Sequence, residues 1–181
     1  MTRFGLVMVT YFTTALIGAL QFFHTAPQLI WNATASTPIG LYGIRPAGVL
    51  HINELVAAMP PEPVASFLTD HGFLPKGVPL LKHVMALPGQ TICRIGAAVS
   101  IDGNVIGEAL ARDSRGRTLP VWSGCRTITA DEIFLMNRTV PDSLDGRYFG
   151  PFPTHSIIGQ AIPLWTDEDN DGDFAWHAPE H

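Results

Sequence analysis

The sequence predicts a mainly β domain with one short helix, preceded by a single transmembrane helix. Glycine and proline contribute 17 and 15 of the 181 residues, which supplies many turns and disfavours a helical bundle. Short apolar runs rich in β-forming residues lie between these turns and predict the strands. A charge-free apolar run near the amino end predicts the transmembrane helix.

Composition excludes several classes of protein. The net charge of −5 disfavours a nucleic-acid binder, which needs a basic face, so no nucleic-acid partner is expected. An apolar share of 46% excludes a disordered chain. Once the membrane segment is set aside, the remaining length suits one domain with a single sizeable core.

The amino end reads as a membrane anchor. Residues 4–23 carry no charge, and a helix of this length spans about 30 Å, the thickness of a bilayer core. Arg3 precedes the run, which by the positive-inside rule places the rest of the chain outside the cytoplasm. The alternative is a cleaved signal peptide, because Ala33-Thr34-Ala35 resembles a cleavage site. That site lies well beyond the apolar run, so we favour residues 1–24 as cytoplasmic amino terminus and uncleaved anchor.

The exported domain is expected to cover residues 25–166, starting with a polar tether at 24–39. The one helix is predicted at residues 62–71, where Pro60, Pro61 and Pro63 mark the start and Gly72 the end. Asp102-Gly103 predicts the turn of a hairpin over 91–107. Residues 108–120 are polar and 138–153 rich in turn formers, so both are expected to be loops. Further strands are predicted at 40–45, 49–58, 79–87, 132–137 and 156–165.

Residues 167–181 form the third predicted segment, an acidic, mobile tail. Asp167 starts a pattern similar to a calcium loop, with acids at positions 1, 3 and 5 and glycine at position 6. Position 12 is Ala178 instead of the glutamate that such a loop needs. The histidines show no ligand spacing either. No metal or other cofactor is therefore predicted.

The two cysteines, Cys93 and Cys125, belong to no metal-binding or redox motif. In an oxidising compartment outside the cytoplasm they can form one disulfide. The alternative is a pair of buried thiols. Export of the domain favours the disulfide.

Lys82 is the first candidate for chemistry. It lies in the apolar strand 79–87, with apolar neighbours on both faces. Such a lysine either extends its ammonium group to the edge or is desolvated, and desolvation lowers its pKa. A neutral amine can act as general base for a serine hydroxyl. Lys76, in a loop between Pro75 and Gly77, is the exposed alternative and a poor base.

Two further segments supply hydroxyl and charged groups. Ser36 precedes a Pro-x-Gly turn shortly after the apolar run. Residues 142–151 (DSLDGRYFGP) bring Ser143, Asp145 and Arg147 into one glycine-bounded loop. Each segment by itself is equally typical of an ordinary surface turn.

Together, the three segments resemble the signal peptidase clan of membrane-bound serine peptidases, which use a Ser-Lys dyad. The Ser-x-Pro sequence is similar to the nucleophile motif, LLKHVMALPGQ to the motif of the base, and NRTVPDSLDGRYFGP to the Ser-x-Asp-x-Arg motif. The three motifs follow one apolar segment in the family's order, and the resemblance covers about residues 28–165. It implies a signal-peptidase-like β domain.

Within this clan the chain resembles the TraF-type conjugation peptidases more than the general leader peptidases. The sequence around Ser36 reads N-x-T-x-S-x-P-x-G-L-Y, and the two cysteines, LP-x-W and DGRYFGP also suit that branch. General leader peptidases usually have Ser-Met-x-Pro and Gly-Asp-Asn-x-Asp, whereas this chain has Ser-Thr-Pro and Met136-Asn137-Arg138. The departures favour the conjugation branch.

The resemblance implies a role for each site residue. Ser36 would be the nucleophile and Lys82 the general base, with Thr34 contributing its hydroxyl to an oxyanion hole beside the Ser36 N–H. Ser143 would hydrogen-bond the Lys82 amine. Asp145, through Arg147, would orient the loop, and a structural role for Asp145 is as consistent with the pattern as a catalytic one.

The resemblance also implies partners and a location. The substrate would be a pilin or propilin precursor, processed beside conjugation or type IV secretion components. The enzyme would be a single-pass protein of the bacterial inner membrane, in contact with its lipid, and its catalytic domain would face the periplasm. General leader-peptide cleavage is the alternative activity, and a non-enzymatic anchored β module is the alternative class.

Overall fold

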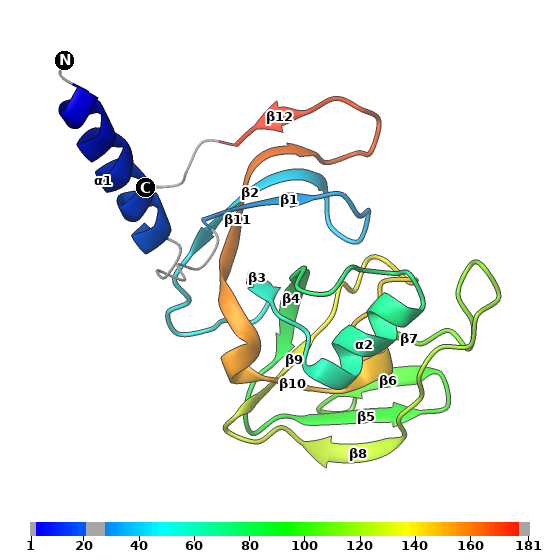
Figure 1. Ribbon diagram of the computed structural model, residues 1–181. Coiled ribbons are helices and arrows are strands. Elements are labelled where there is room, and N and C mark those ends of the chain that lie inside the picture. Colours follow the sequence, from blue (N-terminus) through cyan, green and yellow to red (C-terminus); the bar gives the residue numbers. More distant parts are fainter. Residues whose placement is uncertain (1–2, 21–27, 178–181) are drawn as a thin grey trace.

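The computed structural model describes residues 3–20 and 28–177 (Figure 1). Strands arranged in two sheets dominate the described part, so the predicted mainly β class is confirmed. The helices are α1 (Arg3–Leu20), α2 (Glu62–Asp70) and the single-turn α3 (Gly146–Phe149). The strands are β1 (Leu29–Asn32), β2 (Ile39–Arg45), β3 (Leu55–Ala58), β4 (Leu80–Ala86), β5 (Thr91–Ile95), β6 (Ala98–Ile101), β7 (Asn104–Glu108), β8 (Gly124–Thr127), β9 (Glu132–Leu135), β10 (Phe152–Pro153), β11 (Ile157–Asp167) and β12 (Ala175–Trp176).

The larger sheet has eight strands in the order β1-β2-β11-β3-β4-β9-β10, with β12 added beside β11. All its pairings are antiparallel. The strand β11 is the longest and pairs with β2 along one part and with β3 along another. The strand β4 lies between β3 and β9, which places the middle of the Lys82 segment in the interior of the sheet.

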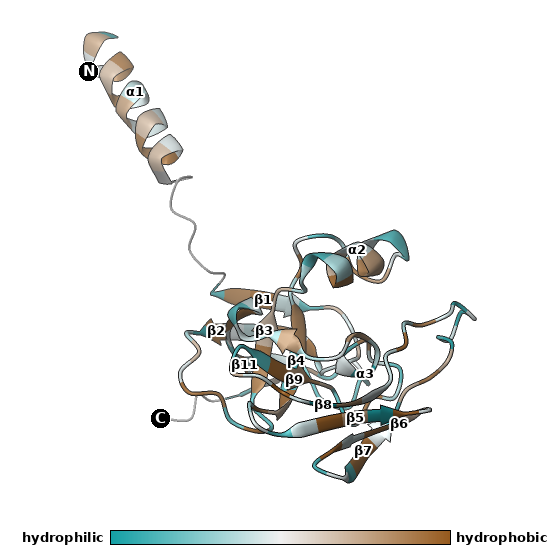
Figure 2. Cartoon of the chain, turned by 90° about the horizontal axis from the view of Figure 1, so that it is seen from below, coloured by the Kyte–Doolittle hydropathy of each residue, from teal (hydrophilic) through white to brown (hydrophobic). Residues whose placement is uncertain are grey.

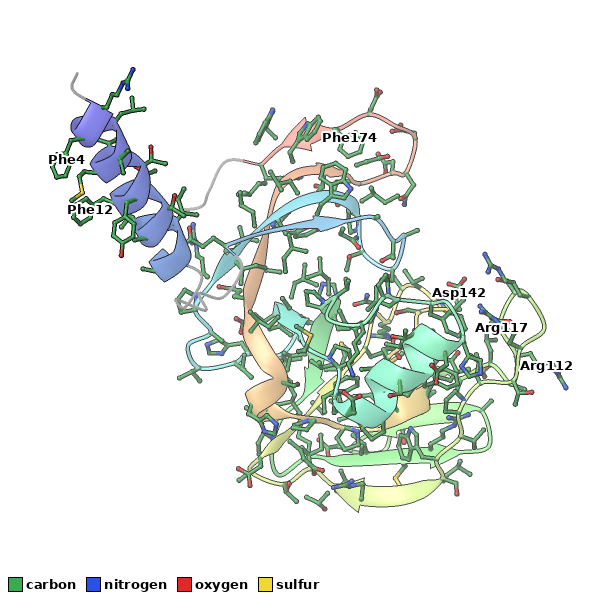
Figure 3. All side chains as sticks on the ribbon, in the orientation of Figure 1. Phe4, Phe12, Arg112, Arg117, Asp142 and Phe174 are labelled. Carbon is green, nitrogen blue, oxygen red and sulfur yellow. A yellow bond between two sulfur atoms is a disulfide. The ribbon has the colours of Figure 1, made fainter. Side chains whose placement is uncertain are left out.

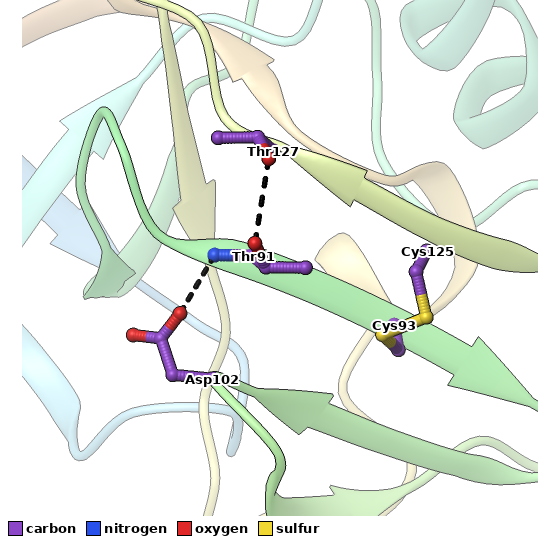
Figure 4. The surroundings of a disulfide bond; sticks show 5 residues. All are labelled: Thr91, Cys93, Asp102, Cys125 and Thr127. Carbon is purple, nitrogen blue, oxygen red and sulfur yellow. Dashed lines mark hydrogen bonds between the residues drawn. A yellow bond between two sulfur atoms is a disulfide. The ribbon is translucent and has the colours of Figure 1, made fainter.

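The smaller sheet has four strands in the order β7-β6-β5-β8. Asp102 and Gly103 both have positive φ, 49° and 83°, so they form the predicted hairpin turn between β6 and β7. Cys93 and Cys125 are paired neighbours on β5 and β8 and form a disulfide, as predicted (Figure 4). This bond joins the edge strand β8 to the inner strand β5 of the small sheet.

The two sheets share one hydrophobic core. Ile92, Val99 and Ile101 of the small sheet pack against Phe134 of β9 and Tyr148 of α3. A neighbouring cluster joins α2, through Leu68, to the larger sheet. The segment that carries Ser143, Asp145 and Arg147 therefore passes between the two sheets.

Helix α1 contains the described part of the predicted anchor. Its residues are mainly apolar (Figure 2), and side chains such as Phe4 and Phe12 are largely exposed. Residues 21–23 of the predicted span lie outside the described residues. Within the described ranges, no helix combines the length and the hydropathy that a membrane crossing requires. The anchor therefore stays a prediction.

The segment predicted as an acidic tail contains a short strand, β12. After β11 the chain turns back, and Trp176 of β12 pairs and stacks with Trp165. Phe174 lies on this returning segment (Figure 3), stacked on Trp31 of β1. Residues 178–181 lie outside the described part. Aromatic contacts across the turn, which charge and composition do not reveal, hold the segment in place.

Other element predictions need smaller corrections. The tether contains a strand, β1, which pairs with β2. The strand predicted at residues 49–58 is confirmed only from Leu55, because a turn with Asn53 at φ 68° precedes it. The strand β8 was not predicted. The loop predicted at 138–153 contains α3, whose first turn is capped when the Asp145 carboxylate accepts from the Arg147 N–H.

Candidate active site

Lys82 lies in β4 with only 3% of its surface exposed. Its Nζ lies 3.2 Å from Ser36 Oγ and donates a hydrogen bond to Ser143 Oγ at 2.9 Å. These contacts join three segments far apart in the chain. Of the two alternatives for Lys82, the structure therefore shows the desolvated lysine and not the edge-placed one.

Burial lowers the pKa of Lys82 from its ordinary value of 10.5 to about 8. The main cause is desolvation, which disfavours the charged form. The charge of Asp145 raises the pKa and that of Arg147 lowers it, so these two neighbours oppose each other. An amine with this pKa is partly neutral near pH 8, and the neutral form can accept a proton.

Ser36 lies in a short turn between β1 and β2, held by side chains that neighbour it in sequence. The buried Asn32 amide donates to the carbonyls of Thr37 and Pro38, at 3.0 Å each. The Tyr42 hydroxyl donates to the Pro38 carbonyl at 2.7 Å, and burial raises the pKa of Tyr42 to about 12. This tyrosine therefore remains a hydrogen-bond donor throughout the physiological range. The turn is fixed on its inner side while Ser36 itself stays partly exposed.

Thr34 lies beside Ser36, with 3.3 Å between the two hydroxyl oxygens. Its hydroxyl also donates to Asn32 Oδ1 at 2.9 Å, and its N–H donates to the same oxygen. A hydroxyl has one proton. In this state that proton holds the turn, so a contribution of Thr34 to an oxyanion hole requires the hydroxyl to rotate away from Asn32.

Ser143 and the pair Asp145–Arg147 occupy the segment that faces Lys82. Asp145 and Arg147 are 0% and 1% exposed, and their charged groups lie 2.8 Å apart. Arg147 also donates to the carbonyls of Val140 and Ser143. The Asp145 carboxylate is bound to this guanidinium and to backbone N–H groups, while Ser143 is the member that contacts the amine. The geometry favours the structural role for Asp145.

Close packing at Gly146 explains why this segment needs a glycine. A Cβ there would lie 2.6 Å from a Phe134 ring carbon and 2.8 Å from the Leu135 carbonyl oxygen. From the small sheet, the Arg94 guanidinium donates to the Arg147 carbonyl at 2.6 Å. Trp122 donates to the Gly146 carbonyl at 3.0 Å. The segment is thus held from both sheets.

The sequence did not identify two asparagines in the site. Asn32 holds the turn of Ser36, and Asn137, 1% exposed, contacts both the Ser36 turn and β4. The N-x-T-x-S pattern contained a signal for Asn32. For Asn137 the only signal was its position in the third motif, at the end of a predicted strand.

A cavity of about 480 Å³ opens beside Ser36 and Lys82. Most of its lining is apolar. One side comes from the segment around Ser36, and the other from α2, the loop after it and the start of β4; these residues include Ile30, Trp31, Ala33, Ala35, Leu68, Phe73, Leu74, Val78 and Leu80. The cavity can hold an extended apolar peptide segment next to Ser36 and Lys82.

Lys76 lies away from this arrangement. Its ammonium group is exposed and lies 2.8 Å from the Glu62 carboxylate, which raises the pKa of the lysine. An exposed, charged amine of this kind is a poor base. The structure thus separates the two lysines as the sequence predicted.

A partly exposed serine, a desolvated amine and an apolar peptide-sized cavity on a β scaffold define the class of serine-type peptidases. The family described as "Signal peptidase, peptidase S26" matches residues 1–165. The chain therefore belongs to the signal peptidase family S26, and the predicted resemblance is confirmed. Membership of a peptidase family favours an enzyme over the alternative of a non-enzymatic module.

Curated relatives come from plasmid transfer systems. The chain is 37% identical over 149 residues to a probable conjugal transfer protein TraF of Sinorhizobium fredii, covering 75% of this chain and 76% of that protein. It is 31% identical over 150 residues to the conjugal transfer protein TraF of Agrobacterium fabrum, covering 75% and 81%. A signal peptidase I from Enterococcus faecalis aligns with 63% of this chain and 97% of its own, at 18% identity and a TM-score of 0.39.

Proposed function

We propose that this serine-type peptidase uses Ser36 as nucleophile and Lys82 as general base to process a pilin or propilin precursor in conjugative transfer. The observation that carries the proposal is the buried Lys82 amine, 3.2 Å from the Ser36 hydroxyl. Its pKa of about 8 makes the neutral amine available near neutral pH. A buried amine with no acid–base role would carry the cost of desolvation without a benefit.

The chemistry follows from the geometry. Ser36 Oγ attacks the scissile carbonyl carbon while its proton passes to the Lys82 amine. The tetrahedral oxyanion is stabilised by the Ser36 N–H and, after rotation, by the Thr34 hydroxyl. The Lys82 ammonium then protonates the leaving amine, which leaves an acyl ester on Ser36. A second amine or water, deprotonated by Lys82, attacks this ester and regenerates the hydroxyl.

Supporting groups hold the base in position. Ser143 accepts a hydrogen bond from Lys82 and so directs the amine, whose remaining reactive side faces Ser36. Asp145 and Arg147 fix the backbone of the Ser143 segment through their own ion pair and carbonyl contacts. Their opposed effects on the pKa of Lys82 leave burial as the deciding cause.

The substrate class rests on the relatives. Those named TraF take part in conjugal or plasmid transfer, as their names state. The apolar cavity beside Ser36 suits an extended segment with small or apolar side chains. Both points support a pilin-like precursor, made for the same transfer apparatus and meeting the other conjugation or type IV secretion components there.

The proposed location is the bacterial inner membrane, with residues 4–23 as anchor and the catalytic domain in the periplasm. The exposed apolar side chains of α1 and the Cys93–Cys125 disulfide, typical of an oxidising compartment, support it. Carbonate extraction should leave the protein in the membrane pellet, with its carboxyl end accessible to protease from outside. Release into the soluble fraction would contradict the anchor.

General leader-peptide cleavage is the second candidate, favoured by the family match itself. The two are separated by mass spectrometry of the pilin-like precursor and of unrelated exported proteins, in cells with the wild type or with Ser36→Ala. Conjugative processing predicts that only the precursor changes mass. Hydrolysis of the acyl ester gives a free carboxyl end and adds the mass of one water to the products. Attack by the pilin's own amine adds no water and gives a ring. An unchanged precursor would refute the proposed substrate.

A further inference from the structure

Asn137, two residues after the end of β9, makes contacts that the proposed mechanism does not use. It is 1% exposed, and it is not among the described residues that line the cavity beside Ser36. It therefore lies behind the reactive groups and not on the substrate side. We propose that Asn137 is a positioning residue that sets the approach of Ser36 to Lys82; the inference rests on the dyad proposed above.

The Asn137 side chain joins the backbones that carry the two reactive groups. Its Nδ2 donates to the Ser36 carbonyl at 2.6 Å and to the Leu81 carbonyl at 3.1 Å. Its Oδ1 accepts from the His83 N–H at 3.2 Å. Leu81 and His83 flank Lys82, so one planar amide holds the nucleophile's own residue against both neighbours of the base.

The orientation of this amide is determined by its partners. If the amide were reversed, Oδ1 would face the two carbonyl oxygens and Nδ2 would face an N–H, so three hydrogen bonds would be lost. The same argument assigns a proton to His83 Nδ1, which lies 3.1 Å from Asn137 Oδ1 and must donate to it. Every polar position of the amide is thus used.

Asn137 also links this clamp to the buried ion pair. Its backbone N–H donates to Asp145 Oδ2 at 3.0 Å, and its carbonyl accepts from Arg147. The residue is therefore held by the Asp145–Arg147 pair on one side and holds the dyad on the other. Buried networks of this kind are rigid when every member is satisfied.

A rigid clamp behind the dyad has a specific kinetic consequence. Proton transfer from Ser36 to Lys82 requires a hydrogen-bond distance, and a displacement of about 1 Å can reduce a rate by roughly 100-fold. The cavity that receives the peptide is formed by other residues. Loss of the Asn137 amide should therefore lower kcat per folded enzyme and leave KM nearly unchanged. General destabilisation lowers the apparent kcat only through the unfolded fraction, so kcat is compared at a temperature where each variant is folded.

The test uses the full-length protein in detergent and a fluorogenic peptide with alanine at the first and third positions before the scissile bond. Asn137→Ala removes the whole clamp, and Asn137→Asp keeps its shape but replaces the donor with an acceptor. We expect each to lower kcat by roughly 100-fold with KM nearly constant. A wild-type kcat in Asn137→Asp would overturn the role of the Nδ2 donor. A wild-type kcat in Asn137→Ala would overturn the inference itself.

Two sets of variants keep the result unambiguous. Ile92→Ala, in the small sheet and fully buried, destabilises the fold without touching the clamp. Ile92→Ala should lower Tm but keep the wild-type kcat at a temperature where the variant is folded. If its kcat at that temperature fell as much as that of Asn137→Ala, the effect of Asn137 would be one of stability alone. Ser36→Ala and Lys82→Ala are measured in the same assay. If they keep activity, the dyad fails; if they are inactive while Asn137→Ala is normal, only the present inference fails.

Discussion

Both sheets bury apolar side chains, and they differ in the polar groups buried on or beside them. The larger sheet and the segment beside it bury Lys82, Asn137 and Asp145, all of which are hydrogen-bonded or ion-paired. The small sheet buries mainly apolar groups such as Ile92 and Val99, and a disulfide closes its edge. Apolar burial stabilises without specifying chemistry, whereas buried polar groups cost free energy unless each is paired.

This difference separates function from support. Lys82 lies on the larger sheet, and Ser36 lies in the turn between its strands β1 and β2. The small sheet holds the back of the segment that faces Lys82, through Arg94 and the core around Tyr148. A change on the larger sheet should therefore affect the reaction directly. A change on the small sheet should affect stability first. The predictions below test this division.

The largest effect is expected at the dyad. Ser36→Ala and Lys82→Ala should each lower peptide cleavage by several orders of magnitude while the fold is kept, as judged by circular dichroism. Because the two groups act as a unit, the double variant should be scarcely worse than either single one. Lys82→Arg should also be inactive, since a guanidinium stays protonated. Substantial activity of Lys82→Arg would disprove the mechanism.

The pH dependence of cleavage should follow Lys82. Under the proposed mechanism the free enzyme is active when the Lys82 amine is neutral, and the pKa of this amine is about 8. kcat/KM should therefore rise by about tenfold for each pH unit below this value and level off above it. A profile measured between pH 6 and 10 checks this. A profile that is flat through pH 8, or that falls there, would exclude Lys82 as the base.

Substitution of Asp145 tests whether its buried ion pair with Arg147 has a structural role or takes part in the reaction. Asp145→Asn leaves the Arg147 charge buried without its partner, which should lower the free energy of unfolding by about 3–5 kcal/mol. Activity should decline in step with unfolding, measured by urea denaturation and peptide cleavage on the same sample. A normally stable Asp145→Asn enzyme without turnover would show direct participation of the acid.

The disulfide tests the supporting role of the small sheet. It closes a loop with a sequence separation of 32, so in the chain-entropy picture it should stabilise the fold by about 3–4 kcal/mol. Reduction should lower Tm, while kcat of the still-folded protein should hardly change. The unreduced, unfolded protein should show no thiol that can be alkylated. Two free thiols would exclude the bond.

The smallest effect is expected at Lys76, the exposed counterpart of Lys82. Lys76→Ala removes a surface ion pair with Glu62 and touches neither sheet's core. Cleavage and Tm should stay at the wild-type level. If Lys76→Ala were the inactive variant and Lys82→Ala were active, the assignment of the two lysines would be reversed.

Local sequence patterns were sufficient for several elements. Short apolar runs between turn residues predicted β4 and β9, and Asp102-Gly103 predicted the hairpin turn. Three prolines followed by a glycine predicted α2. The same patterns, with the family resemblance, identified Ser36, Lys82 and Ser143, which meet in the structure. These features depend on a few neighbouring residues, so they can be recognised without the fold.

Other features depended on contacts between distant segments. The strand β1 and the return of the chain at β12 form because strand edges and aromatic rings meet partners elsewhere in the chain. The burial of Lys82, and with it the lowered pKa, exists only once β3, β9 and the Ser143 segment surround the amine. Asn137 was missed for the same reason. The sequence by itself determined which groups were available for chemistry. Only the tertiary structure decided the distances between these groups, their solvation and the hydrogen bonds that hold them. Each of these properties depends on residues that folding brings together.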